Sequence, residues 1–116
     1  MSKIQEIQTL KQWEEIYMKS AERKAIILKY NEHCVICQRA YSEFEKFFSQ
    51  YDKENVDVYI IDVVRSKPVS KQVANDLEVT HQSPQLIIMK DFDSVWCDNH
   101  QSIELKNIQA GSRKIS

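Results

Sequence analysis

The sequence predicts an α/β protein with a central, mixed four-stranded sheet flanked by helices. An apolar run at Ala25–Tyr30 is followed by a long amphipathic helical pattern and then by a second apolar run at Val56–Val63. Such a βαβ unit crosses over with a right hand, so we expect its two strands to be parallel. A third apolar run, Gln85–Met89, starts directly after a proline, and a polar turn at 91–93 leads into a fourth strand. These last two strands are expected to form an antiparallel hairpin.

Apolar residues at three- and four-residue spacing predict the two longer helices. The first covers about Thr9–Ser20, with Thr9 as its N-cap. The second begins at Cys34 and stops at the polar residues 52–55. Core packing explains its apolar stripe without a cofactor site: Cys37, Ala40, Tyr41, Phe44, Phe47, Phe48 and Tyr51.

Two shorter helices complete the expected fold. Pro68 fits the first turn of a helix over about Lys67–Asp76, where its missing N–H has no helical partner to lose. A final helix runs from Ser102, as its cap, to Gly111, which we place at the C′ position where helices commonly end. The inward-facing residues are Val69, Val73 and Leu77 in one helix and Ile103, Leu105 and Ile108 in the other.

Size and composition indicate one domain over residues 1–116 in the cytoplasm. Sixteen Lys and Arg residues oppose 17 Asp and Glu, for a net charge of −1, which gives no reason to expect a nucleic acid or an anionic membrane as partner. The sequence shows neither the apolar core of a signal peptide nor a run long enough to span a bilayer. A single glycine excludes a glycine-rich phosphate loop. In a reducing compartment, a close pair among three cysteines indicates catalysis or metal binding.

The pair Cys34 and Cys37 directs attention to thiol chemistry. A helix N-terminus carries about half a positive charge, which lowers the pKa of a nearby thiol below its free value of about 8.5. Residues three apart share a helix face, so the two sulfurs are expected within bonding range. Cys34 is thus the predicted nucleophile. His33, if protonated, lowers the pKa of Cys34 further; the alternative is that His33 is a solvated loop residue.

A cysteine pair at the start of the second helix, in this order of helices and strands, is the pattern of the thioredoxin fold. Cys34-Val35-Ile36-Cys37, the block Thr80–Gln85 with Ser83-Pro84 inside it, and Val95, Trp96 and His100 resemble the bacillithiol-system thioredoxin-like family, the YtxJ-type bacillithioredoxins. This resemblance spans nearly the whole chain.

The resemblance implies a thiol–disulfide oxidoreductase that reduces protein–bacillithiol mixed disulfides without a cofactor. Bacillithiol is then the thiol co-substrate, and bacillithiolated client proteins are the partners. By position, Cys34 resembles the attacking cysteine, Pro84 the cis-proline, and Ser83 the residue whose backbone pairs with a bound thiol. Cys37 stands where the family usually has serine, and Val35 where it tends to have proline. Cys37 is therefore either a resolving thiol or a buried bystander.

Other interpretations remain open. Cys34, Cys37, Cys97 and His100 have the residue types of a Cys₃His zinc site, although a helix start is an unusual place for two of its ligands. Cys97 alone fits a strand residue better than a reactive thiol. His81 and His100 are expected as hydrogen-bonded turn residues rather than bases. A thioredoxin-fold binding module with silent cysteines is the non-enzymatic alternative.

Overall fold

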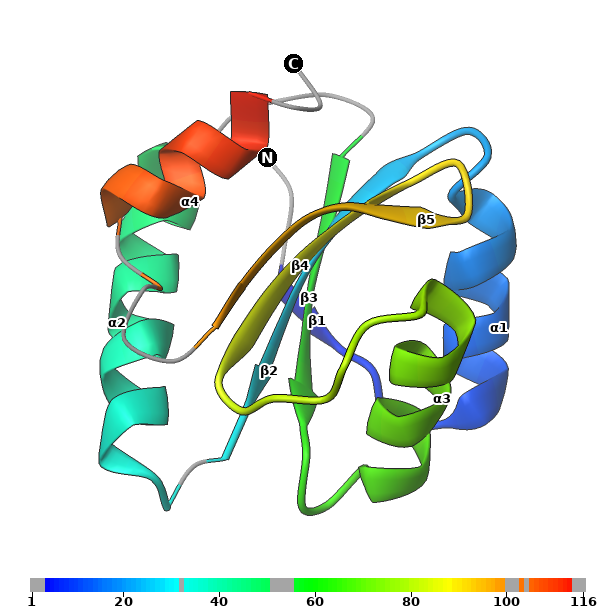
Figure 1. The fold of residues 1–116 in the computed structure, drawn as a ribbon, viewed down its shortest axis with the longest axis horizontal. Helices are drawn as coiled ribbons and strands as arrows, with labels where there is room; N and C mark the ends of the chain where they lie inside the picture. Colours follow the sequence, from blue (N-terminus) through cyan, green and yellow to red (C-terminus); the bar gives the residue numbers. More distant parts are fainter. Residues whose placement is uncertain (1–3, 32, 51–55, 100–102, 104, 114–116) are drawn as a thin grey trace.

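The computed structural model describes residues 4–31, 33–50, 56–99, 103 and 105–113. Within them, a five-stranded sheet of order β1-β3-β2-β4-β5 is flanked by four helices (Figure 1). The strands are β1 (Ile4–Glu6), β2 (Lys24–Tyr30), β3 (Val56–Asp62), β4 (Gln85–Lys90) and β5 (Asp93–Asn99). The helices are α1 (Leu10–Lys19), α2 (Val35–Gln50), α3 (Lys67–Leu77) and α4 (Leu105–Ser112). The expected α/β class is confirmed.

The parallel pairing of β2 with β3 and the hairpin of β4 with β5 were expected, and the structure adds the pairing of β2 with β4. β2 and β3 are parallel, β2 and β4 are antiparallel, and β4 and β5 form the hairpin. The expected number of four strands was wrong. β1 adds a fifth at the edge, parallel to β3, with Ile4 opposite Val58. Three residues are too few to display a period, so only the pairing with β3 reveals β1 as a strand.

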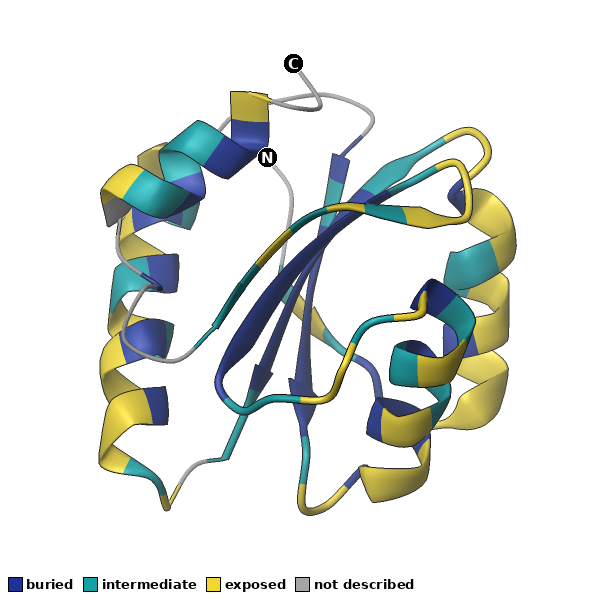
Figure 2. Cartoon of the chain, viewed as in Figure 1, coloured by how far each residue is buried: buried dark blue, intermediate teal, exposed yellow. Residues whose placement is uncertain are grey.

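Each face of the sheet has its own apolar core. In Figure 1, α2 and α4 cover the left face and α1 and α3 the right. Phe44 and Phe47 of α2 pack on the first face, with Tyr41 and Phe48 partly buried beside them, while Tyr51 lies outside the described residues. Trp13 of α1 packs with α3 on the second face. The central strands are buried along nearly their whole length, as the dark ribbons of Figure 2 show.

The predicted starts of α1, α2 and α3 agree with the structure to within about one residue. Thr9 caps α1 through a reciprocal capping box with Gln12, and Pro68 lies in the first turn of α3. The polar break at 52–55 and the cap Ser102 lie outside the described residues.

The expected stop at Gly111 was wrong, because this glycine lies inside α4. A Cβ at this position would come within 2.6 Å of Trp96 Nε1. Gly111 is therefore present to let the helix approach the Trp96 ring, and not to adopt the left-handed conformation of a C′ residue. No described helix has the length and apolarity needed to cross a membrane.

Candidate active site

Cys34 lies at the junction between β2 and α2, two elements that meet at the bottom of Figure 1. It directly precedes α2, and its carbonyl accepts the first helical hydrogen bond, from the Gln38 amide at 3.0 Å. This is the N-cap position, where a side chain meets the unpaired N–H groups of the first turn. Cys34 is partly exposed, so its sulfur is within reach of a substrate.

The environment of Cys34 favours its thiolate. Hydrogen bonds from the Cys37 amide and the Cys37 thiol lower the pKa of Cys34, partial desolvation opposes them, and the Ile36 amide adds a smaller lowering contribution. Donors that face a sulfur stabilise its charged form. The expectation of a depressed pKa at this helix start therefore has a specific cause in three hydrogen bonds.

Cys37 lies one turn inside α2 and is fully buried. Burial raises the pKa of Cys37, and its interaction with Cys34 raises it further, whereas a hydrogen bond with the Ser83 side chain and one with the Asn31 backbone act in the opposite direction. Cys37 Sγ lies 3.5 Å from Ser83 Oγ. The two cysteines thus differ as a nucleophile and a proton-bearing partner would, with Cys34 the more acidic.

The structure brings Cys34, Cys37 and Ser83 together from segments far apart in sequence. Ser83 belongs to the segment between α3 and β4, and the Ser83–Pro84 peptide bond is cis. Pro84 is buried, while Val35 and Val64 are 78% and 61% exposed at the same end of the sheet as Cys34. Exposed apolar side chains and the partly exposed Cys34 therefore occur at one end of the sheet.

Asn31 is a site residue that the sequence reasoning missed. Its side-chain oxygen accepts a hydrogen bond from the His33 amide at 3.0 Å, and its carbonyl accepts one from the Cys34 amide at 3.1 Å. The segment before α2 is therefore bent by an Asx turn, which delivers Cys34 to the helix start. An asparagine directly after an apolar strand is a common signal for such a turn.

The histidines are the next candidate residues. His33 is exposed and is not among the groups that shift the pKa of Cys34. His81 Nδ1 lies 3.4 Å from Ser70 Oγ, as expected for a hydrogen-bonded turn residue. Burial, with a smaller contribution from the Lys29 charge, lowers the pKa of His81. His100 lies outside the described residues.

Cys97 lies on the sheet face opposite α2. It pairs in register with Ile87, whose side chain belongs to the core under α1 and α3. The residue is exposed, but partial desolvation of its sulfur raises the pKa of Cys97. Among the described residues, no group of three His, Cys, Asp or Glu side chains could hold a metal ion.

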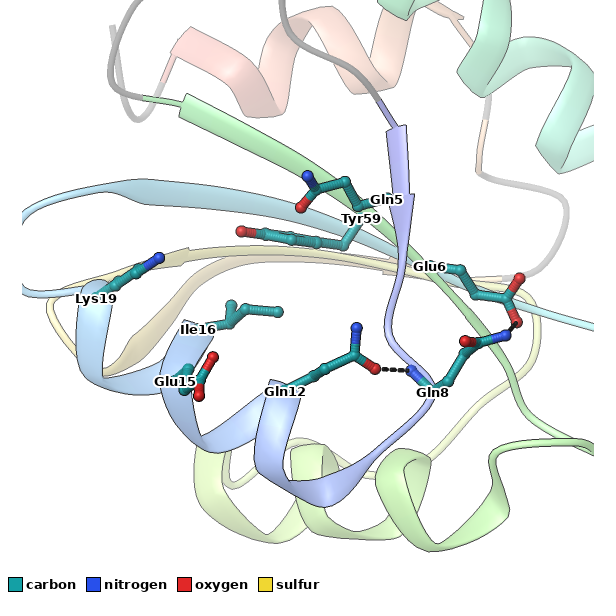
Figure 3. Close-up of a pocket in the computed structure, with 8 residues that line it drawn as sticks. All are labelled: Gln5, Glu6, Gln8, Gln12, Glu15, Ile16, Lys19 and Tyr59. Atoms are coloured by element: carbon teal, nitrogen blue, oxygen red, sulfur yellow. Dashed lines mark hydrogen bonds between the residues drawn. The ribbon is translucent and has the colours of Figure 1, made fainter.

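A surface pocket of about 490 Å³ lies elsewhere, between β1, α1 and β3 (Figure 3). Its wall is mainly polar, and some of its polar groups bond to one another: the Gln8 backbone N–H donates to Gln12 Oε1 at 2.8 Å. It contains no cysteine, so the thiol chemistry belongs to the Cys34 end of the sheet.

Comparison with known proteins agrees with this geometry. A solved protein described as having a thioredoxin fold shares 24% identity and a TM-score of 0.81, covering 94% of this chain and 93% of its own. Malassezia sympodialis thioredoxin shares 16% identity and a TM-score of 0.78, with coverages of 100% and 94%. Fasciola hepatica thioredoxin shares 17% identity and a TM-score of 0.72, with coverages of 95% and 98%. These likenesses show the thioredoxin fold.

The family comparison is more specific. The sequence model of the monothiol bacilliredoxin BrxC family matches residues 5–108. This match covers most of the chain and confirms the family resemblance that the cysteine and Ser83-Pro84 motifs suggested. The chain therefore belongs to the monothiol bacilliredoxin BrxC family, a redox family of thioredoxin-like proteins.

Proposed function

We propose that this protein is a thiol–disulfide oxidoreductase that reduces protein–bacillithiol mixed disulfides through Cys34. The observation that carries the proposal is the Cys34 sulfur at the N-terminus of α2, partly exposed and hydrogen-bonded by the Ile36 and Cys37 amides. Such a sulfur is a thiolate at a lower pH than a free cysteine, and the thiolate is the attacking species in disulfide exchange. Family membership supports bacillithiol as the small thiol.

The first step transfers bacillithiol from the client to the enzyme. The Cys34 thiolate attacks the bacillithiol sulfur of the mixed disulfide, and the client sulfur leaves as a thiolate that takes a proton from solvent. The client is then reduced and Cys34 carries the bacillithiol. We assign to Ser83 and Pro84 the side of the site against which the substrate lies, since Ser83 is already next to Cys37.

Two routes complete the cycle. In one, the Cys37 thiolate attacks Cys34 Sγ, bacillithiol leaves as a thiolate, and a Cys34–Cys37 disulfide forms, which a further thiol or dithiol must reduce. In the other, the thiolate of a second bacillithiol attacks the sulfur of the bacillithiol bound to Cys34, which yields bacillithiol disulfide and releases the Cys34 thiolate. Neither route needs a cofactor, and both need the reduced thiols that a cytoplasm maintains.

Intact-mass measurements test the proposal. A bacillithiolated client is mixed with wild-type protein, Cys34→Ser or Cys37→Ser, each in a Cys97→Ser background that removes the remote thiol. We expect no client reduction by Cys34→Ser. An adduct of one bacillithiol that accumulates in Cys37→Ser, and not in the parent, indicates the internal route. Client reduction by Cys34→Ser at the parent rate would refute the assignment.

A further inference from the structure

The segment that carries Ser83, residues 80–84, has little backbone support of its own. Among the described residues, it makes no backbone–backbone hydrogen bond of the turn or loop kind. Its conformation therefore depends on side chains that reach it. Ser83 from this segment meets Cys37, so whatever holds the segment also places a hydrogen-bonding group beside the second sulfur.

Gln85, the first residue of β4, makes the shortest of the three side-chain contacts to this segment. Its Nε2 donates to the Thr80 carbonyl at 2.9 Å and to Asn99 Oδ1 at 3.0 Å. The first bond spans the segment from one end to the other. The second anchors the amide to β5, where Asn99 lies opposite Gln85 in register.

The burial of Gln85 indicates that this donor is why an amide is present. Its side chain is 1% exposed, yet its Oε1 has no hydrogen-bond partner in the part of the chain described. An unpaired buried carbonyl is unfavourable, and an apolar side chain of similar shape avoids that cost. Core packing alone therefore does not account for glutamine here, whereas its polar contacts to Thr80, Asn99 and Cys97 do, and of these only the one to Thr80 reaches the segment that carries Ser83.

A second contact reaches the same segment from α3. His81 Nδ1 lies 3.4 Å from Ser70 Oγ, and the carbonyl of Ser70 accepts a hydrogen bond from Lys29 Nζ at 2.9 Å. Lys29 is fully buried in β2. The first two residues of the segment are thus held in place: Thr80 is held by Gln85, and His81 is held by Ser70.

We infer that Gln85 is a positioning residue that, by holding the Thr80 carbonyl, keeps Ser83 against Cys37 and so prepares Cys37 to resolve the Cys34 mixed disulfide. The inference rests on the proposed function of the two cysteines. Ser83 lowers the pKa of Cys37, so a segment that drifts from Cys37 leaves that thiol more firmly protonated. Resolution then slows, while the helix-start donors that activate Cys34 stay in place.

The test separates the two steps with one equivalent of the disulfide of nitrothiobenzoate, whose released thiolate absorbs visible light. In a Cys97→Ser background, Cys34 attack releases the first thiolate at a rate that depends on reagent concentration. Cys37 attack on Cys34 Sγ releases the second at a rate that does not. The variants are Gln85→Met, Ser83→Ala and their double mutant. Ile87→Val, on the same face of β4, is the control for a small loss of core packing.

We expect Gln85→Met to leave the first phase within about twofold of the parent and to slow the second about tenfold, the size of one lost hydrogen bond. The double mutant should be no slower than the slower single variant, since both changes act through the same contact. Ile87→Val should alter neither phase. An unchanged second phase in Gln85→Met, or fully additive effects in the double mutant, would overturn the inference.

His81→Ala keeps the inference testable if Gln85→Met does not fold, because His81 is exposed and its removal leaves the core intact. We expect a second phase slowed about threefold. A parent rate in this variant contradicts the two-contact arrangement. If Cys34→Ser shows the same first phase as the parent, the proposed function itself is contradicted. This result differs from an unchanged second phase in Gln85→Met, which contradicts only the inference about Gln85.

Discussion

Replacing Lys29 by methionine should change how stability depends on pH. Lys29 is fully buried, and among the described residues its hydrogen-bond acceptor is the Ser70 carbonyl. Burial is the main cause that lowers the pKa of this ammonium from 10.5 to about 8, and Cys97 opposes it slightly. The unfolded chain should hold the Lys29 proton with the ordinary pKa, so folding and protonation are linked.

The sign of the effect follows from which state holds the proton. Below about pH 8 both states are protonated, and the folded state bears the full cost of a buried cation. Between pH 8 and 10.5 the unfolded chain keeps a proton that the folded chain has lost, so stability rises with pH. With 1.36 kcal/mol per pKa unit, the gain from about pH 7 to about pH 9.5 is roughly 2 kcal/mol.

Urea unfolding of both proteins at these two pH values measures the effect. The free energy of unfolding of the wild type, relative to Lys29→Met, should increase by about 2 kcal/mol between them. The difference between the proteins removes the common contributions of other groups that titrate in this range. Lys11→Met, at an exposed position of α1, is the matched control and should behave as the wild type. Equal pH dependence in wild type and Lys29→Met would refute the reasoning.

Three further outcomes follow from the site and the fold. In a Cys37→Ala variant, the pKa of Cys34 should stay below the ordinary cysteine value, because the backbone donors remain. It should lie above the wild-type pKa, because the Cys37 thiol donor is lost, and the pH dependence of the Cys34 alkylation rate measures both differences. Ser83→Ala should raise the pKa of Cys37, measured from the pH dependence of its alkylation in a Cys34→Ser protein. Gly111→Ala should destabilise the protein by about 1–2 kcal/mol in urea unfolding, since its Cβ would overlap Trp96, and should become stabilising by up to about 1 kcal/mol in a Trp96→Leu background, where helix propensity remains.

The features that could be predicted from the sequence are those written into a continuous stretch of chain. The capping box at Thr9 and the apolar runs that became β2, β3 and β4 all lie within a few residues of the structure they determine. Cys34 belongs to this class, because a cysteine between a strand and a helix start needs no distant residue to reach the N-cap. Local patterning therefore located the candidate nucleophile before any contact was known.

The features that were missed depend on contacts between distant segments. β1 is a strand through its pairing with β3, and a glycine occupies position 111 inside α4 because the Trp96 ring lies against it. Lys29 is a charged residue in an otherwise apolar run, yet it is fully buried and donates to the Ser70 carbonyl of α3. Residue type and spacing do not show which polar side chains other elements bury, so the roles of Lys29 and Gln85 could not be predicted from the sequence.

The same distinction separates the two halves of the proposed reaction. The activation of Cys34 uses donors from its own helix, the Ile36 and Cys37 amides, which the backbone of α2 supplies whatever side chains surround it. The preparation of Cys37 uses Ser83, which is 46 residues away in sequence and reaches the sulfur only if the segment between α3 and β4 is held in place. A chain with serine at position 37 would keep the first half and have no thiol for the second. The internal route thus requires both the Cys37 sulfur and the Gln85–Thr80 contact that holds the Ser83 segment. Variants of Gln85 and of Cys37 should therefore be compared in the same assay.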